Sequence, residues 1–139
     1  MPRIIRNVLS IFAGTFVAII LIALVQAVAH SMYPPPPDFD FNDPAALAEL
    51  MATAPVGALL LVILSYFLGT LAGSMLATKL SAPEGPARQG MFVGVLMLIA
   101  AVMNLVKIPH PLWFAAGSVA AIIVAGIIGT LAGCKLRKP

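Results

Sequence analysis

Residues 7–37, NVLSIFAGTFVAIILIALVQAVAHSMYPPPP, form a run of 31 residues without Asp, Glu, Lys or Arg. Three more charge-free runs follow at residues 50–78, 89–106 and 108–134. About 20 helical residues cross a bilayer core about 30 Å thick, and backbone polar groups in lipid must be satisfied within the segment. The sequence therefore predicts an all-α integral membrane four-helix bundle.

The composition agrees with a membrane protein. Hydrophobic residues make up 61% of the chain and charged residues 9%, whereas soluble domains are about half apolar and a quarter charged. A soluble chain this short could not bury so much apolar surface. The net charge of +3 does not indicate nucleic acid, because the basic residues flank the apolar runs. We expect the lipid bilayer as a partner, no nucleic acid and no cofactor.

The charges also predict the topology. Basic residues mark the cytoplasmic side of a membrane protein. If four helices alternate in direction, seven of the eight basic residues fall on the side of the two termini, and four of the five acidic residues fall on the other. We therefore expect both termini in the cytoplasm. The basic residues are Arg3, Arg6, Lys79, Arg88, Lys135, Arg137 and Lys138, and the acidic ones are Asp38, Asp40, Asp43 and Glu49.

The chain is expected to form a single membrane domain, residues 1–139, with an outer loop at residues 30–55. Four prolines at residues 34–37 favour a stiff extended backbone in this loop. Asp43 followed by Pro44 is typical of a helix start and predicts a short interfacial helix over residues 44–53. The expected spans are residues 8–29, 56–78, 90–106 and 112–134.

An internal repeat connects the expected spans. The sequence GTLAG at residues 69–73 recurs at residues 129–133, and GTFVA at residues 14–18 loosely matches GMFVG at residues 90–94. A two-span hairpin present twice in the same orientation predicts a pseudo-two-fold axis along the membrane normal. The alternative is chance recurrence, because small and apolar residues are common in membrane helices.

Small residues recur at every fourth position in the second and fourth spans. Such rows let helix backbones approach closely in lipid. They predict that these two spans pack on each other within the chain, or that a seam forms between copies. The row of the second span is Ser65, Gly69, Gly73 and Ala77, and the row of the fourth is Ala121, Ala125, Gly129 and Gly133.

No acidic or basic residue lies inside an expected span. Ionisable intramembrane residues mark ion paths and proton relays, so the sequence argues against a proton-coupled transporter. It disfavours in particular the four-span small multidrug-resistance transporters, which need a carboxylate in the first span. Asn104, Thr70 and Thr130 are the candidates for lining a solute path. The alternative role for Asn104 is a hydrogen bond between helices.

The expected outer face gathers His30, Tyr33, Asp38, Asp40 and His110. Carboxylates and imidazoles can hold a divalent cation, but their spacing here matches no metal-binding motif. We therefore expect a hydrated acidic loop and no metal site. The chain also lacks nucleophile, zinc and phosphate-loop motifs, so we do not expect an enzyme.

Several short motifs carry a resemblance: HSMYPPP at residues 30–36, LGTLAG at residues 68–73, Asn104, and PHPLW at residues 109–113. With these the chain resembles a loose group of small four-span proteins of the bacterial inner membrane. The resemblance covers most of the chain and implies the architecture and that location, but no activity.

Two functions fit these observations. The first is a structural or accessory protein whose helices pack against copies of itself or against a larger membrane complex. In that case Gly73→Leu or Gly133→Leu should disrupt assembly, while Asn104→Leu should have little effect. The second is a passive channel or uniporter for a small neutral solute, in which Asn104→Leu should abolish flux.

Overall fold

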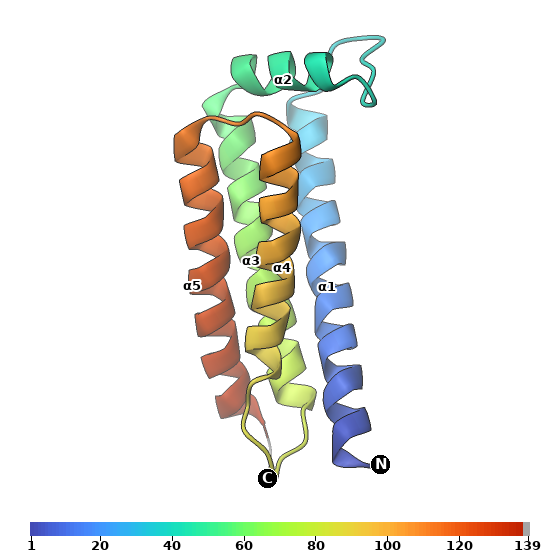
Figure 1. Cartoon of the computed structure of the whole chain (residues 1–139), viewed down its shortest axis with the longest axis vertical. Coiled ribbons are helices and arrows are strands. Elements are labelled where there is room, and N and C mark those ends of the chain that lie inside the picture. The colour runs from blue at the N-terminus through green and yellow to red at the C-terminus, as the bar shows by residue number, and fades with distance from the viewer. Residues whose placement is uncertain (138–139) are drawn as a thin grey trace.

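In the computed structural model, residues 1–137 are described, and within them the chain forms five helices. The short helix α2 lies across one end of the bundle (Figure 1). The four long helices have the length and apolar composition needed to cross a membrane. The protein is therefore a multi-pass membrane protein with a four-helix bundle. The helices are α1 (Arg3–Met32), α2 (Pro44–Thr53), α3 (Val56–Leu80), α4 (Gln89–Lys107) and α5 (Leu112–Leu136).

The long helices extend beyond the charge-free runs that predict them. The helix α1 has 30 residues and is therefore about 45 Å long at the usual rise per residue. Its first turns, which carry Arg3 and Arg6, project past an apolar core about 30 Å thick. The shortest of the four, α4, has 19 residues and ends at Lys107, whose stem can follow the apolar surface while its ammonium group stays in water.

The start of α2 is fixed by Asp43 and Pro44. The Oδ1 atom of Asp43 accepts a hydrogen bond of 2.9 Å from the backbone N–H of Ala45. Proline occupies the first turn of the helix, where a backbone N–H would have no partner in the helix. Just before this start, Asp38 has a φ of 62°, a left-handed conformation that Asp adopts more readily than most residues.

We expect Asp43→Ala to destabilise α2 by about 1 kcal/mol, because the helix loses its N-terminal cap. Hydrogen exchange in detergent micelles should show faster exchange of the α2 amides while the amides of the long helices keep their protection. Glu49→Ala removes the same charge from the exposed side of α2 and is the control. Equal exchange rates in the two variants would contradict a capping role for Asp43.

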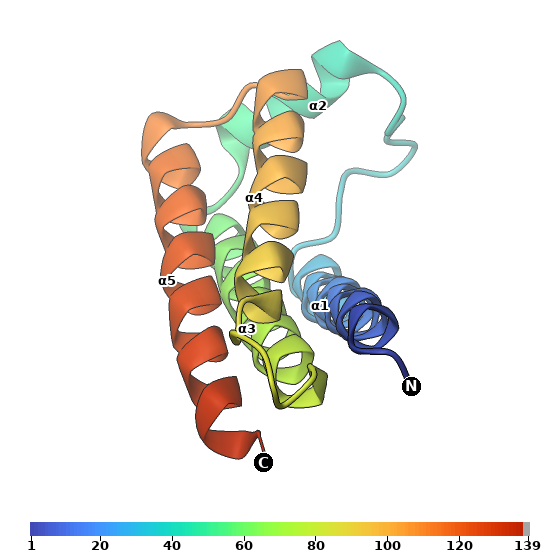
Figure 2. The ribbon, with the colours of Figure 1, turned by 60° about the horizontal axis from the view of Figure 1, so that its bottom comes forward.

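The central helix of the bundle is α3, which lies between α1 and α5 (Figure 2). On its α1 side the two backbones almost touch. A Cβ atom added at Gly73 would lie 2.5 Å from the carbonyl oxygen of Gly14, and one added at Gly69 would lie 2.7 Å from that of Ala18. Small residues on both helices therefore permit an approach that larger side chains would prevent.

The opposite side of α3 receives α5 in the same way. A Cβ atom added at Gly133 would lie 2.5 Å from the carbonyl oxygen of Met75, and one at Gly129 would collide with that of Leu71. The row of small residues on α5 thus packs on α3, whereas the row on α3 packs on α1. The second and fourth spans, α3 and α5, therefore pack on each other as expected, but their two rows of small residues do not face each other. All of these row residues are buried except Ala121, which is half-buried.

This arrangement gives the two GTLAG motifs different neighbours. The glycines of the α3 copy, Gly69 and Gly73, lie against α1, whereas those of the α5 copy, Gly129 and Gly133, lie against α3. Under the expected pseudo-two-fold axis, the glycines of the α5 copy would lie against α4 instead. Duplication of a helical hairpin stays a prediction.

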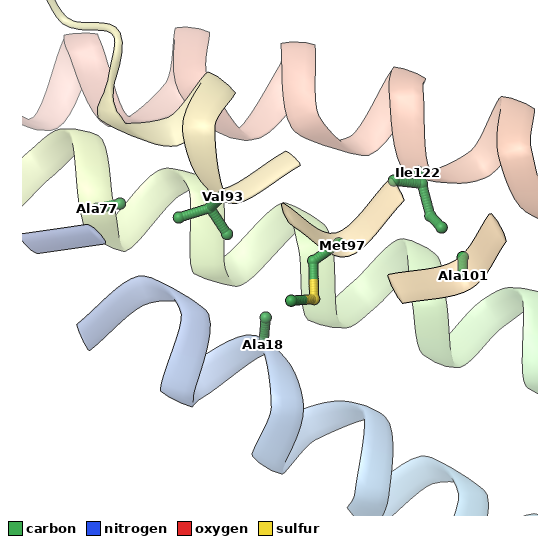
Figure 3. Close-up of a cluster of buried hydrophobic side chains, with 6 residues drawn as sticks. All are labelled: Ala18, Ala77, Val93, Met97, Ala101 and Ile122. Atoms are coloured by element: carbon green, nitrogen blue, oxygen red, sulfur yellow. The ribbon is translucent and has the colours of Figure 1, made fainter. Parts of the chain in front are cut away.

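The centre of the bundle is a cluster of apolar side chains drawn in Figure 3. Met97 and Val93 of α4 point into the space between α1 and α3, and Ala18 of α1 lies opposite Met97 (Figure 3). Large apolar residues such as Phe12 and Phe92 lie on the outside of the bundle and are exposed. Small residues inside and large ones outside are expected in lipid, where burial of large apolar side chains gives no hydrophobic gain.

Candidate functional site: a pocket beneath α2

A pocket of about 350 Å³ lies at the end of the bundle that α2 covers. Residues of α1, α2, α3, α4 and α5 all contribute to it, together with the proline segment that follows α1. Apolar side chains make most of its wall; from α2, α3 and the link between them these are Leu50, Met51, Ala54, Ala58, Leu59 and Val62.

Three uncharged polar side chains enter the pocket from three different helices: Gln26 of α1, Tyr66 of α3 and Asn104 of α4. The Asn104 side chain lies beside the Tyr66 hydroxyl. The Nε2 atom of Gln26 donates a hydrogen bond of 3.3 Å to the hydroxyl of Ser65, which in turn donates to the Val62 carbonyl at 2.7 Å. These contacts orient the Gln26 amide, and the three polar groups share a mostly apolar space.

Two histidines also line the pocket. The Nδ1 atom of His30 lies 2.8 Å from the Gln26 carbonyl oxygen, and that of His110 lies 2.5 Å from the Ile108 carbonyl oxygen. Because a carbonyl oxygen only accepts, Nδ1 is the donor in both rings. The His110 ring also stacks on Phe114, with ring centres 4.9 Å apart.

The segment after α1 closes one side of the pocket. Pro34 and Pro35 belong to the pocket wall, and their fixed φ angles make this wall stiff. The hydroxyl of Tyr33 rests against Gly57 at the start of α3, where a Cβ atom would collide with it. Glycine at this position therefore lets the tyrosine lie over α3.

The structure brings together only part of the expected outer-face set. His30, Tyr33 and His110 line the pocket, whereas Asp38 and Asp40 lie in the exposed loop before α2 and do not line it. Within residues 1–137, no three His, Cys, Asp or Glu side chains gather at a potential metal site.

The candidates for a solute path lie at different places in the bundle. Asn104 lines the pocket. Thr70 is fully buried on α3, with its methyl group near Gly126 of α5. The Thr130 hydroxyl donates to the Gly126 carbonyl at 2.7 Å and lies against Gly90 at the start of α4. Gln26 and Tyr66 were not among the expected site residues, because the polarity of each inside an apolar run was the only signal.

No family model, curated protein or solved structure matches this chain. The fold defines a multi-pass membrane protein, and a mostly apolar pocket with a few polar side chains lies at one end of its bundle. The chemistry of that site follows from its own residues.

Proposed function

We propose that this protein is a non-enzymatic accessory protein of the bacterial inner membrane, which binds a small, neutral, amphipathic molecule in the pocket beneath α2. One observation carries the proposal: a pocket of about 350 Å³ with mostly apolar walls, whose polar groups include Gln26, Tyr66 and Asn104. Pockets for small molecules are usually of this size and have mostly apolar walls with a few polar groups that orient the ligand.

The lack of Asp, Glu, Lys and Arg in the pocket wall supports a neutral ligand. The residues that line the pocket include no Asp, Glu, Lys or Arg. A charged ligand would lose its hydration without gaining an ionic partner, which is costly in an apolar site. A hydroxyl, carbonyl or amide group on the ligand can exchange hydrogen bonds with Asn104 and Tyr66. The apolar part of the ligand would lie against α2 and α3.

The proposal includes an orientation of the protein in the membrane. Arg3 and Arg6 of α1 and Lys135 of α5 lie at the end of the bundle opposite α2 (Figure 1). The positive-inside rule then predicts that the termini lie in the cytoplasm and the pocket lies in the outer leaflet.

A protein partner, either a second copy or another membrane protein, would contact the lipid-facing surface of the bundle. The rows of small residues are not available to it, because they already pack against other helices of the same chain.

A passive channel is the second candidate. The hydroxyls of Thr70, Ser74 and Ser118 are fully buried and have no hydrogen-bond partner among the described residues, so they offer polar positions inside the bundle. Close packing opposes this function, since a Cβ atom added at Gly94 of α4 would lie 3.4 Å from the Cα atom of Gly126 of α5. This contact leaves no open path between α4 and α5 at that position, which favours binding over conduction.

Trp113 provides a test of binding. It is the only tryptophan of the chain, and its ring meets Phe114 of the pocket wall edge-on, with centres 6.2 Å apart. The protein in detergent micelles is titrated with linear alcohols of six to ten carbons, and with the matching alkyl carboxylates and alkylammonium ions. We expect a saturable change of Trp113 fluorescence with the alcohols and a much weaker response to the ions.

Two variants control this experiment. Ala58→Phe places a ring in the pocket and should abolish the saturable response, because Ala58 belongs to its wall. Ala100→Phe adds the same ring to the exposed side of α4 and should leave the response unchanged. Equal responses to alcohols and ions, or an unchanged response in Ala58→Phe, would contradict the proposed function.

A further inference from the structure

At the end of the bundle opposite α2, the loop between α3 and α4 is held by both ends of the chain. The backbone N–H of Ala82 donates to Oδ1 of Asn7 at 2.8 Å. The Nη1 atom of Arg137 donates to the carbonyl oxygens of Ala82 and Gly85 at 3.2 and 3.0 Å. These bonds fix the loop beside the first turns of α1.

Next to this loop, an open groove of about 450 Å³ runs between the start of α1 and the end of α3. Its surface is almost entirely apolar, and its apolar lining residues are Met1, Leu9, Ala13 and Leu80. The hydroxyl of Ser10, which also lines the groove, donates to the Asn7 carbonyl at 2.7 Å. The groove faces outward from the bundle, where the membrane surrounds the helices.

The only Lys or Arg that lines this groove is Arg6. Its Nε atom donates to the carbonyl oxygen of Leu80 at 2.9 Å, which satisfies a carbonyl at the C-terminal end of α3 and orients the guanidinium group. Among the described residues, no acceptor bonds to its Nη atoms. A planar guanidinium whose two Nη atoms are free to donate matches the geometry of a phosphate group.

We propose that this groove binds an anionic phospholipid, with one acyl chain along Leu9, Ala13 and Leu80 and the phosphate at Arg6. Three features support this ligand. The groove lies on a membrane-facing surface, its wall is apolar along its length, and its cation lies at the end of the bundle where the other basic residues gather. Anionic headgroups are attracted to basic residues at the membrane edge. This site is independent of the pocket beneath α2, which lies at the other end.

Native mass spectrometry of the full chain in mild detergent tests the proposal, with phosphatidylglycerol and phosphatidylcholine of equal chain length as probes. The intact protein should bind one phosphatidylglycerol at least about fivefold more tightly than phosphatidylcholine, as expected for one well-placed cation. Arg6→Gln should remove this preference. Arg88→Gln loses the same charge at the same end of the bundle, but outside the groove, and should retain the preference.

A third variant separates lipid binding from folding. Ala13→Leu fills the groove and keeps Arg6, so it should weaken binding of phosphatidylglycerol about fivefold or more while the melting temperature stays unchanged. Equal losses in Arg6→Gln and Arg88→Gln would show a diffuse charge effect and overturn the proposal. Full binding of phosphatidylglycerol by Ala13→Leu would also overturn the proposal. Displacement of the lipid by millimolar inorganic phosphate would overturn it as well, because it would indicate a site for a free anion.

Discussion

Gly73→Leu is expected to destabilise the bundle by about 3 kcal/mol, at the upper end of the usual cost of overpacking. Already the first added carbon, Cβ, would lie 2.5 Å from the Gly14 carbonyl oxygen and 2.8 Å from the Ala18 Cβ atom. Both obstacles belong to the α1 helix itself rather than to a flexible side chain. The clash is therefore relieved only if α1 moves away from α3, which also opens the central cluster around Met97.

The free energy of unfolding in mixed micelles measures this effect, with far-ultraviolet circular dichroism and Trp113 fluorescence as independent signals. Ala120→Leu adds a leucine to the exposed side of α5 and should leave the stability within about 0.5 kcal/mol of the wild type. Wild-type stability in Gly73→Leu, combined with a change in oligomer size, would show that this row of glycines forms a seam between copies instead.

Asn104→Leu is expected to weaken ligand binding about tenfold or more and to leave the fold intact. The side chain is half-buried in the pocket and lies beside Tyr66. Leucine has nearly the same size but offers neither donor nor acceptor, so a polar group of the ligand would be buried without a partner. Such a loss costs about 1–3 kcal/mol, and 1.4 kcal/mol corresponds to a tenfold change in affinity.

The alcohol titration followed by Trp113 fluorescence measures this change. Asn42→Leu makes the same substitution in the exposed loop before α2 and should bind like the wild type. Unchanged affinity in Asn104→Leu would contradict a role for this amide in binding. Unchanged affinity together with lost solute flux in liposomes would favour the passive channel.

The bundle itself was predictable from local features of the sequence. Charge-free runs long enough to cross a bilayer indicate the four long helices, because in lipid the backbone N–H and C=O groups of each run must form their hydrogen bonds within the run. Asp43 and Pro44 indicate the start of α2, because the capping bond to Ala45 forms within three consecutive residues. Each of these signals lies within the segment that it predicts.

The pocket was only partly predictable, because its residues are distant in the sequence. The sequence indicates Asn104, His30 and His110 as candidates, because they are polar residues near the ends of apolar runs. Their common location depends on how α1, α4 and α5 meet beneath α2, and no local pattern specifies that. The same reason explains why Asp38, which lies close to His30 in the sequence, lies outside the pocket.

The sequence by itself determined that this chain crosses a membrane with four helices and carries a short capped helix between the first two. Only the tertiary structure decided which helices face each other. Small residues lie on α1, α3 and α5, so the pattern indicates close contacts without naming the partners of each row. Hydropathy does not indicate which helices are partners, because an apolar helix face is about as stable against lipid as against another helix. The choice follows from the fit of Gly73 to Gly14 and of Gly133 to Met75, a match of surface shapes that exists only when the helices are side by side.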